Sequence, residues 1–229
     1  MSVIVFDMDD TLYLERNFVI SGFRSVSKYI DERTNLTGET LFEELVTDFE
    51  NGIRSRNFDL LLSRHPELEQ TLKVDDLVHH YRNHEPSINL MPEAAEMLRM
   101  LKSRGYTLGI ISDGYLETQT RKIRSLGLQS IMDIIVLTDI WGRDFWKPHI
   151  RAFEKIENVH GSNGDSYIYV GDNPTKDFKP AKKRGWKAIR LKIPGQLHYL
   201  EEPASAEDEP EIECTSFEEL GIFLLQQDQ

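Results

Sequence analysis

Two short apolar runs in this chain each end directly at a group of carboxylates. The run Val3–Phe6 leads into Asp7-Met8-Asp9-Asp10-Thr11, and the run 167–170 leads into Gly171-Asp172-Asn173-Pro174-Thr175-Lys176-Asp177. Four apolar residues that stop at acidic groups are typical of a strand in a parallel sheet buried on both faces. Open α/β sheets bind ligands at the carboxyl ends of such strands. The sequence therefore predicts an α/β fold with both acidic groups at the ligand-binding edge of one parallel sheet.

The spacing of the carboxylates indicates their chemistry. Asp7 and Asp9 are two residues apart, so a chain that turns as it leaves the strand can aim both at one reacting centre, one as nucleophile and the other as acid or base. Gathering them with Asp172 and Asp177 would be strongly repulsive without a cation. Mg²⁺ takes oxygen ligands, keeps several waters and borrows further ligands from substrate phosphate. We therefore expect a magnesium site and a phosphorylated substrate.

Two further positions suit phosphate binding. Ser112 closes another apolar run, and Lys147 stands just before a proline. We expect the Ser112 hydroxyl to donate to a phosphate oxygen, helped by the backbone N–H groups of Asp113 and Gly114 ahead of a helix. Lys147 would supply a point charge to the phosphate and to Asp7.

Taken together, these residues resemble the four ordered motifs of the haloacid dehalogenase-like hydrolase superfamily. The first motif matches Asp7 to Thr11, the second Ser112, the third Lys147, and the fourth Gly171-Asp172 with Asp177. Any one motif is common in unrelated proteins, whereas four in order are specific. The resemblance implies a Rossmann-like, doubly wound parallel sheet with a small α-helical cap inserted after the first strand.

The resemblance also implies a mechanism. Asp7 would attack phosphorus to give an aspartyl-phosphate, and Asp9 would protonate the leaving oxygen and then activate water. Magnesium would bind Asp7, the Asp9 backbone carbonyl and Asp172, with Asp177 acting directly or through water. Thr11 is expected to orient Asp9 and to belong to the phosphate-binding set. An aspartate at position 9 favours phosphoryl transfer over carbon–halogen cleavage, so we expect a magnesium-dependent phosphomonoester hydrolase.

The long interval between the first two motifs predicts the cap. Residues 15–88 show no strand-like alternation and carry helical patterns over 18–30, 38–49 and 75–81. We expect this segment to form the α-helical cap, and residues 1–14 and 89–229 to form the catalytic core. In the core the pattern predicts helices over 93–104, 116–125 and 180–184, and strands over 106–111, 134–137 and 187–191. The acidic composition of residues 201–213 predicts a mobile loop. A short helix should follow it, capped by Ser216 with Glu219.

Composition narrows the class of partner. A net charge of -12 and a pI near 5.1 argue against nonspecific nucleic-acid binding, which draws on a basic surface. The single cysteine, Cys214, permits no internal disulfide and suits a reducing compartment. No run approaches the ~20 apolar residues of a membrane span, and the start lacks a signal-peptide pattern. We expect a cytoplasmic enzyme acting on a small phosphorylated metabolite, a nucleotide, sugar or organic phosphate, with no nucleic-acid or membrane partner.

Several alternatives stay open at this point, as do the substrate's identity and the oligomeric state. A sugar-phosphate mutase would use the same Asp7 and Asp9 but would need the cap to exclude water. A non-catalytic binding module could keep the fold, although it would be expected to have lost at least one motif residue. Phosphonate cleavage is disfavoured, because the cap lysines Lys28 and Lys73 lie in ordinary amphipathic contexts.

The segment 15–88 holds two other groups of candidate residues. Three histidines without a cysteine or an acidic partner make a zinc site unfavourable: His79, His80 and His84. Four arginines are candidates to grip an anionic leaving group: Arg16, Arg54, Arg56 and Arg82.

Overall fold

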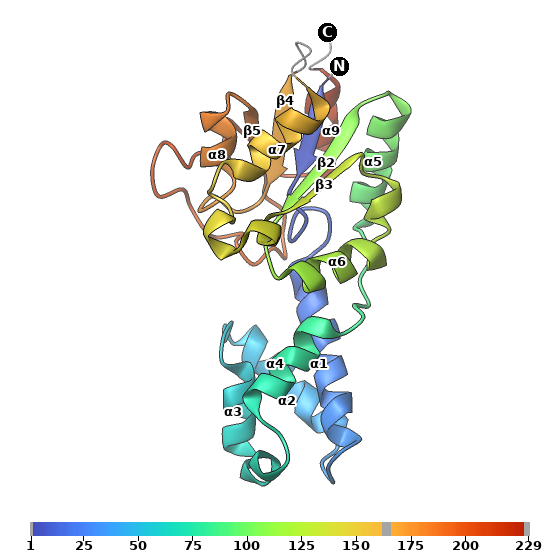
Figure 1. Ribbon diagram of the computed structural model, residues 1–229, viewed down its shortest axis with the longest axis vertical. Helices are drawn as coiled ribbons and strands as arrows, with labels where there is room; N and C mark the ends of the chain where they lie inside the picture. The colour runs from blue at the N-terminus through green and yellow to red at the C-terminus, as the bar shows by residue number, and fades with distance from the viewer. Residues whose placement is uncertain (1, 162–165, 227–229) are drawn as a thin grey trace. The chain divides into compact units, whose positions relative to one another are not determined.

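The chain divides into two compact units in the computed structural model, which describes residues 2–161 and 166–226 (Figure 1). One unit comprises Met1–Arg16 with Ile88–Gln229, and the other comprises Asn17–Ser87. We name them the core unit and the helical unit. Residues 162–165 and 227–229, which the sequence assigns to the core, lie outside the described residues.

The core unit contains a six-stranded sheet in which every neighbouring pair of strands is parallel. The order across the sheet is β3-β2-β1-β4-β5-β6. The strands are β1 (Val3–Phe6), β2 (Thr107–Ser112), β3 (Ile134–Leu137), β4 (Tyr167–Gly171), β5 (Lys187–Leu191) and β6 (Ile212–Cys214). Strand order reverses direction on either side of β1, as in doubly wound folds. The predicted α/β class with a doubly wound parallel sheet is confirmed.

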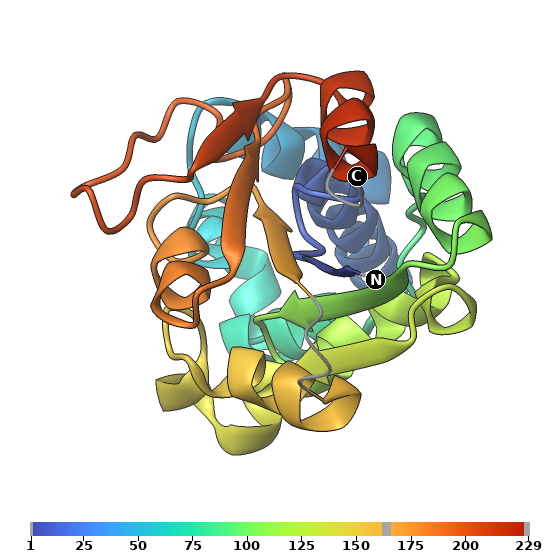
Figure 2. The ribbon, with the colours of Figure 1, turned by 90° about the horizontal axis from the view of Figure 1, so that it is seen from above.

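Helices cover both faces of this sheet, as the view in Figure 2 shows. On one face, α5 (Pro92–Ser103) packs against α9 (Phe217–Leu225). On the other, α7 (Arg151–His160) and α8 (Phe178–Lys183) share a buried cluster with the strands, built around large side chains such as Phe153, Phe178 and Trp186. The remaining core helix, α6 (Leu116–Ser125), follows β2 directly.

The register of the central strands fixes where the site forms. Phe6, the last residue of β1, pairs with Ile110 of β2 on one side and with Val170 of β4 on the other. The chain segments that leave these three strands therefore emerge side by side at the carboxyl edge. This is the point of strand-order reversal, where open α/β sheets bind ligands.

The helical unit is built around an aromatic core. Its helices are α1 (Glu15–Asp31), which begins in the core unit, α2 (Gly38–Glu50), α3 (Asn57–Arg64) and α4 (Val74–Asn83), with a 3₁₀ turn at Pro66–Gln70. Phe23 meets Phe49 and Phe58 edge-on, with ring centroids 6.2 and 6.1 Å apart. Gly22 allows Tyr81 to pack on α1, because a Cβ there would lie 2.3 Å from the Tyr81 ring.

Three elements differ from the sequence prediction: α3, α7 and β6. Residues 212–214 form the edge strand β6 rather than the end of a loop, because Glu211 N donates to Ala188 O and Lys192 N donates to Cys214 O. Helices α3 and α7 were not predicted. By contrast, the predicted cap at Ser216 is present, since its Oγ accepts from Glu219 N at 3.1 Å. No helix in the described part of the chain is both long and apolar enough to cross a membrane.

Candidate active site

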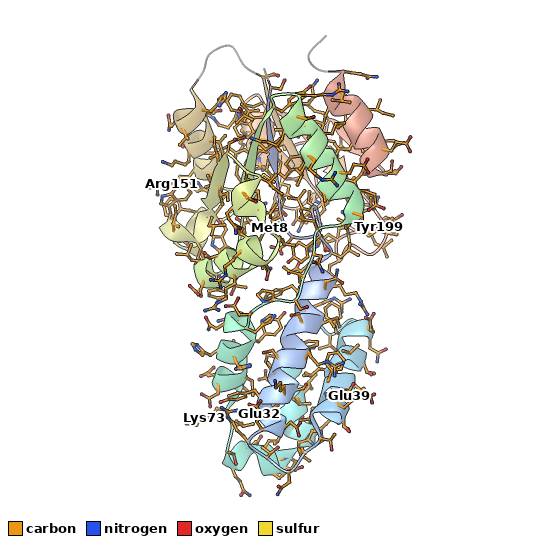
Figure 3. The ribbon with its side chains drawn as sticks, turned by 90° about the vertical axis from the view of Figure 1, so that its right-hand side faces the viewer. Met8, Glu32, Glu39, Lys73, Arg151 and Tyr199 are labelled. Atoms are coloured by element: carbon orange, nitrogen blue, oxygen red, sulfur yellow. The ribbon has the colours of Figure 1, made fainter. Side chains whose placement is uncertain are left out.

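The first acidic loop begins as a continuation of β1. Asp7 N donates to Val170 O at 2.8 Å, which extends the pairing of β1 with β4 by one residue. The next side chain, Met8, is fully buried in the core unit (Figure 3). Leu12 N then donates to Met8 O at 3.0 Å and closes a tight turn. This turn brings the Asp7 and Asp9 carboxylates to the edge where β1, β2 and β4 end.

Lys147 ties three elements together beneath this edge. Its Nζ lies 2.7 Å from Asp7 Oδ1, 2.8 Å from Asp177 Oδ1 and 2.8 Å from the Tyr169 hydroxyl, and its side chain is completely buried. Burial opposes the charge, but Asp177 and Asp7 outweigh it and raise the pKa of the Lys147 ammonium above its ordinary value. Lys147 is therefore a fixed cation beside the Asp7 carboxylate.

Asp177 has both carboxylate oxygens engaged within the protein. Oδ1 accepts from Lys147, and Oδ2 accepts from Asn173 N at 3.0 Å. Burial alone would raise the pKa of Asp177, yet the neighbouring ammonium of Lys147 lowers it. Gly171 makes room for this arrangement, because a Cβ there would lie 2.5 Å from Asp177 Oδ2. Asp177 thus positions Lys147 and the loop that follows β4.

The Asp7, Asp172 and Asp177 carboxylates form a buried cluster that fits a cation. Each offers an oxygen within 4.8 Å of the others. Asp7 Oδ2 and Asp172 Oδ2 are buried and have no hydrogen-bond partner in the described part of the chain. Burial raises the pKa of Asp7 to about 6 and that of Asp172 well above its usual range, and the mutual repulsion of the carboxylates adds to both shifts. Two unpartnered anionic oxygens in one carboxylate cluster are the kind of donor set that a hard divalent ion takes.

The Asp9 carboxylate, in contrast, is fully bonded by protein groups. Lys122 Nζ lies 2.7 Å from Oδ1, the Tyr13 hydroxyl donates to the same oxygen, and Gln119 Nε2 donates to Oδ2 at 2.7 Å. Burial by itself would raise the pKa of Asp9, but Lys122 outweighs it and lowers the pKa. Lys122 is only 4% exposed, so this is a nearly buried ion pair.

The predicted phosphate-binding residues lie at the same edge. Ser112 is buried, and its Oγ accepts from Gln119 Nε2 at 2.7 Å, which leaves its own hydrogen available to another acceptor. The Asp113 carboxylate accepts from Lys147 N and from the Thr138 hydroxyl, so it fixes the backbone that carries Lys147.

Gly114 and Thr11 complete the predicted phosphate-binding set. Gly114 has a positive φ of 126°, and a Cβ there would lie 2.9 Å from Cδ of Gln119. The Thr11 hydroxyl is buried and has no hydrogen-bond partner among the described residues. Asp9 is therefore oriented by Tyr13, Gln119 and Lys122, and it receives no hydrogen bond from Thr11.

Asp10 fixes the acidic loop through hydrogen bonds to neighbouring segments of the core unit. It adopts a left-handed backbone with φ 54°, a conformation that aspartate tolerates when its side chain bonds locally. Its carboxylate accepts from Glu15 N and Leu197 N, both at 2.7 Å, while Gln196 Nε2 donates to its carbonyl at 2.7 Å. The segment after β5 thereby holds the loop that presents Asp7 and Asp9.

The histidines of the helical unit do not converge on a common point. His80 contacts Ser25 and stacks on Tyr29, with ring centroids 4.4 Å apart. His84 lies between the Tyr81 carbonyl and the Ser21 hydroxyl. Their imidazoles pack and form hydrogen bonds within the helical unit.

The three residues that hold the Asp9 carboxylate were not found from the sequence: Tyr13, Gln119 and Lys122. One signal for two of them was present. Helix α6 contains few apolar residues, and its buried positions are Thr118, Gln119, Lys122 and Ile123, of which only the last is apolar. A helix whose inner face is polar has something other than an apolar core to contact.

Comparison with known sequences decides the family. The sequence model of the haloacid dehalogenase-like hydrolases matches residues 4–191, most of the chain. The chain belongs to this family. The resemblance inferred from the four motifs is confirmed, and the chain is a haloacid dehalogenase-like hydrolase.

Curated relatives cover most of this hydrolase. A glyceraldehyde 3-phosphate phosphatase of Methanocaldococcus jannaschii is 27% identical over 192 residues, covering 82% of this chain and 83% of the relative. A protein of the same name from Methanopyrus kandleri is 26% identical over 226 residues, covering 96% and 95%. A pyrophosphatase PpaX of Bacillus pumilus is 26% identical over 178 residues, covering 76% and 75%. These relatives support a phosphatase within the family.

Solved structures of related fold extend over nearly the whole chain. A putative HAD-hydrolase YfnB of Bacillus subtilis, bound to magnesium, has a TM-score of 0.67 at 21% identity, covering 97% of this hydrolase and 98% of that chain. A putative β-phosphoglucomutase of Thermotoga maritima has a TM-score of 0.68 at 17% identity, covering 99% and 100%. At these identities the likeness shows the fold alone.

Proposed function

We propose that this hydrolase is a magnesium-dependent phosphomonoesterase in which Asp7 forms an aspartyl-phosphate intermediate. The observation that carries the proposal is the state of the Asp7 carboxylate. One of its oxygens is held by the buried Lys147 cation, and the other is unpartnered, in a carboxylate cluster where Asp172 also has an unpartnered oxygen. A nucleophilic carboxylate next to a cation site and a fixed ammonium suits attack on a phosphate dianion, whose charge must be neutralised first.

Asp7 and Asp172 would hold Mg²⁺ through their unpartnered oxygens, with the Asp9 backbone carbonyl as a further protein ligand. Both carboxylate oxygens of Asp177 already accept hydrogen bonds from protein groups, so Asp177 would act by fixing Lys147 or through a water. The bound ion supplies positive charge that attracts the substrate phosphate and stabilises negative charge developing in the transition state.

The remaining groups would complete a double displacement. Lys147 holds Asp7 Oδ1 in place, and the Ser112 hydroxyl with the backbone N–H groups of Asp113 and Gly114 binds phosphate oxygens. Asp9 is paired with Lys122, which lowers its pKa, and it is the protonated form of Asp9 that transfers a proton to the leaving oxygen as the phosphorus–oxygen bond breaks. It then takes a proton from the water that attacks the aspartyl-phosphate, which restores free Asp7 and releases phosphate.

We propose that the substrate is a small phosphorylated metabolite, a class that the names of the curated relatives support. The helical unit would act as a cap that selects the leaving group. It contains a pocket of about 260 Å³ that brings Arg54, Arg56 and Arg82 together with aromatic side chains such as Phe58 and Tyr81. Cations beside aromatic surface suit an anionic or planar leaving group.

The cysteine content bears on the cellular compartment. The single cysteine, Cys214, is buried and free, which supports a reducing compartment. We propose a cytoplasmic enzyme.

Phosphate release from a panel of three-carbon, sugar and nucleotide phosphates tests the function. We expect release that needs Mg²⁺, stops with EDTA, and is abolished in Asp7→Asn. The exposed Asp144→Asn variant is a matched control and should retain activity. Retained turnover in Asp7→Asn would overturn the mechanism, and a requirement for a bisphosphate primer would indicate a mutase instead.

A further inference from the structure

Helix α6 supplies two side chains to the carboxylate of Asp9, and neither belongs to a family motif. Lys122 and Gln119 are three residues apart, so they lie on one face of the helix. Lys122 Nζ lies 2.7 Å from Oδ1 of Asp9, and Gln119 Nε2 lies 2.7 Å from Oδ2. Both side chains are buried, 4% and 1% exposed. The two oxygens of Asp9 are thus held from one direction by one rigid element.

We propose that Lys122 and Gln119 are positioning residues that fix the Asp9 carboxylate for proton transfer, an inference that rests on the proposed phosphatase function. Burying a lysine and a glutamine costs free energy unless each is paired. A helix that only covered the sheet would place apolar side chains at these two positions. The pairing with Asp9 is what makes these polar residues tolerable, so their presence is explained by the acid that they hold.

Gln119 also connects the acid to the phosphate-binding edge. Its Nε2 donates to Asp9 Oδ2 and to Ser112 Oγ, both at 2.7 Å. A Cβ at Gly114 would lie 2.9 Å from the Gln119 side chain, so the glycine leaves room for this bridge. Movement of the Ser112 hydroxyl and movement of Asp9 are therefore linked through one amide group.

The Lys122 ammonium stabilises the negative charge that Asp9 carries after it has given up its proton. In the first step the protonated form of Asp9 reacts: its O–H bond breaks, a new O–H bond forms on the leaving oxygen, and the electron pair of the phosphorus–oxygen bond stays with that oxygen. Asp9 is left as an anion beside the Lys122 ammonium. In the second step the anion takes a proton from water. Lys122 holds the anion in place between these two transfers.

Leaving groups of different acidity separate this role from a merely structural one. An alkyl phosphate needs a proton on its leaving oxygen, whereas 4-nitrophenyl phosphate leaves as a stable anion and needs it far less. We expect Lys122→Met to lower kcat for an alkyl phosphate about 10- to 100-fold, part of the 10²–10⁴-fold that acid catalysis contributes. For 4-nitrophenyl phosphate the loss should stay within about threefold on the same grounds.

The second test measures the effect of Lys122→Met in a protein that already carries Asp9→Asn. If Lys122 acts through Asp9, then Lys122→Met should cause no further loss with the alkyl phosphate once Asp9 is asparagine. Lys122→Arg should restore part of the activity, since it keeps the charge. The control is Lys102→Met, which breaks a 2.6 Å ion pair with Asp133 at an exposed position and should change neither substrate. Gln119→Met tests the other positioning residue and serves if Lys122→Met does not fold.

Each result decides the proposal. A selective loss with the alkyl phosphate that disappears in the Asp9→Asn background supports it. Equal losses with both substrates, or a full additional loss in that background, overturn it while the phosphatase function stands. A wild-type enzyme that releases phosphate from no substrate overturns the proposed function, and this inference with it.

Discussion

The two aspartates of the first motif lie two residues apart and have opposite surroundings. Asp7, together with Asp172, presents unpartnered buried oxygens, and we name this pair the metal side. Asp9 is bonded by Tyr13, Lys122 and Gln119, and we name these four residues the acid side. The metal side is incomplete without a ligand, whereas the acid side is satisfied by the protein alone.

This difference separates two ways of building a site. On the acid side, the groups that orient the carboxylate also stabilise the folded chain, so the geometry exists before substrate arrives. On the metal side, burial and mutual repulsion raise the carboxylate pKa values, which is a cost to the metal-free protein. The same substitution, aspartate to asparagine, should therefore change stability in opposite directions on the two sides.

Replacement of Lys147 should have the largest effect on stability, because its ammonium neutralises the carboxylates of the metal side. Replacing it with methionine leaves Asp7 and Asp177 without their shared cation in a buried site. We expect Lys147→Met to lower the free energy of unfolding by about 3–5 kcal/mol, the usual cost of breaking a buried ion pair, and to abolish phosphate release. Urea unfolding of the two proteins measures the difference. A loss under about 1 kcal/mol would show that the ammonium is not needed to hold the carboxylates together.

Asp9→Asn tests the acid side. It leaves Lys122 buried without its opposite charge, and we expect a loss of about 2–4 kcal/mol in the free energy of unfolding, somewhat below a fully buried pair because the Asp9 side chain is 15% exposed. The matched control is Asp144→Asn, an exposed position where the change should be close to zero. A variant as stable as the wild type would mean that the acid side does not hold the fold.

Asp172→Asn should act in the other direction. The substitution removes a charge that burial, Asp177 and Asp7 all oppose. In EDTA we expect the variant to be more stable than the wild type by about 1 kcal/mol. In Mg²⁺ the order should reverse, because ligand binding to the folded state stabilises the wild type by about 2.7 kcal/mol at a concentration 100 times its Kd.

Thermal unfolding of both proteins in EDTA and in Mg²⁺ provides that comparison. Asp9→Asn belongs in the same series, since its backbone carbonyl is retained and its response to Mg²⁺ should persist. A metal-free Asp172→Asn that is less stable than the wild type would contradict the division into two sides.

Much of the fold could be predicted because apolar runs with clear ends specify the central strands. The bounds of β1, β3 and β5 match the predicted residues. Strand β6 could not be found in this way, since it has only three residues and its central one, Glu213, is exposed. It forms because β5 offers an unpaired edge, a property of the sheet and not of the local sequence.

Local sequence also limits how much of the active site could be predicted. Residues that follow strand ends, such as Asp7, Ser112 and Asp172, could be placed together because parallel strands end at one edge. Lys122 and Gln119 could not, since a lysine or glutamine on a helix is normally solvated. Their partner is decided by where α6 lies over the sheet, which no local spacing specifies.

Replacement of Thr11 should have the smallest effect on stability. It extends the comparison of the metal side with the acid side to an uncharged side chain. Its hydroxyl is buried and unpartnered, as the metal-side oxygens are. We expect Thr11→Val to raise the free energy of unfolding by up to about 1 kcal/mol, because it removes an unsatisfied polar atom. It should also lower kcat/KM about tenfold if the hydroxyl binds the phosphate, an effect of one hydrogen bond to a charged group. Thr138→Val is the matched control: its hydroxyl donates to Asp113 at 2.7 Å, so the same substitution should destabilise the protein. Equal stability changes in the two variants would show that an unpartnered oxygen at this edge carries no cost, and the distinction between the metal side and the acid side would then lose its energetic basis.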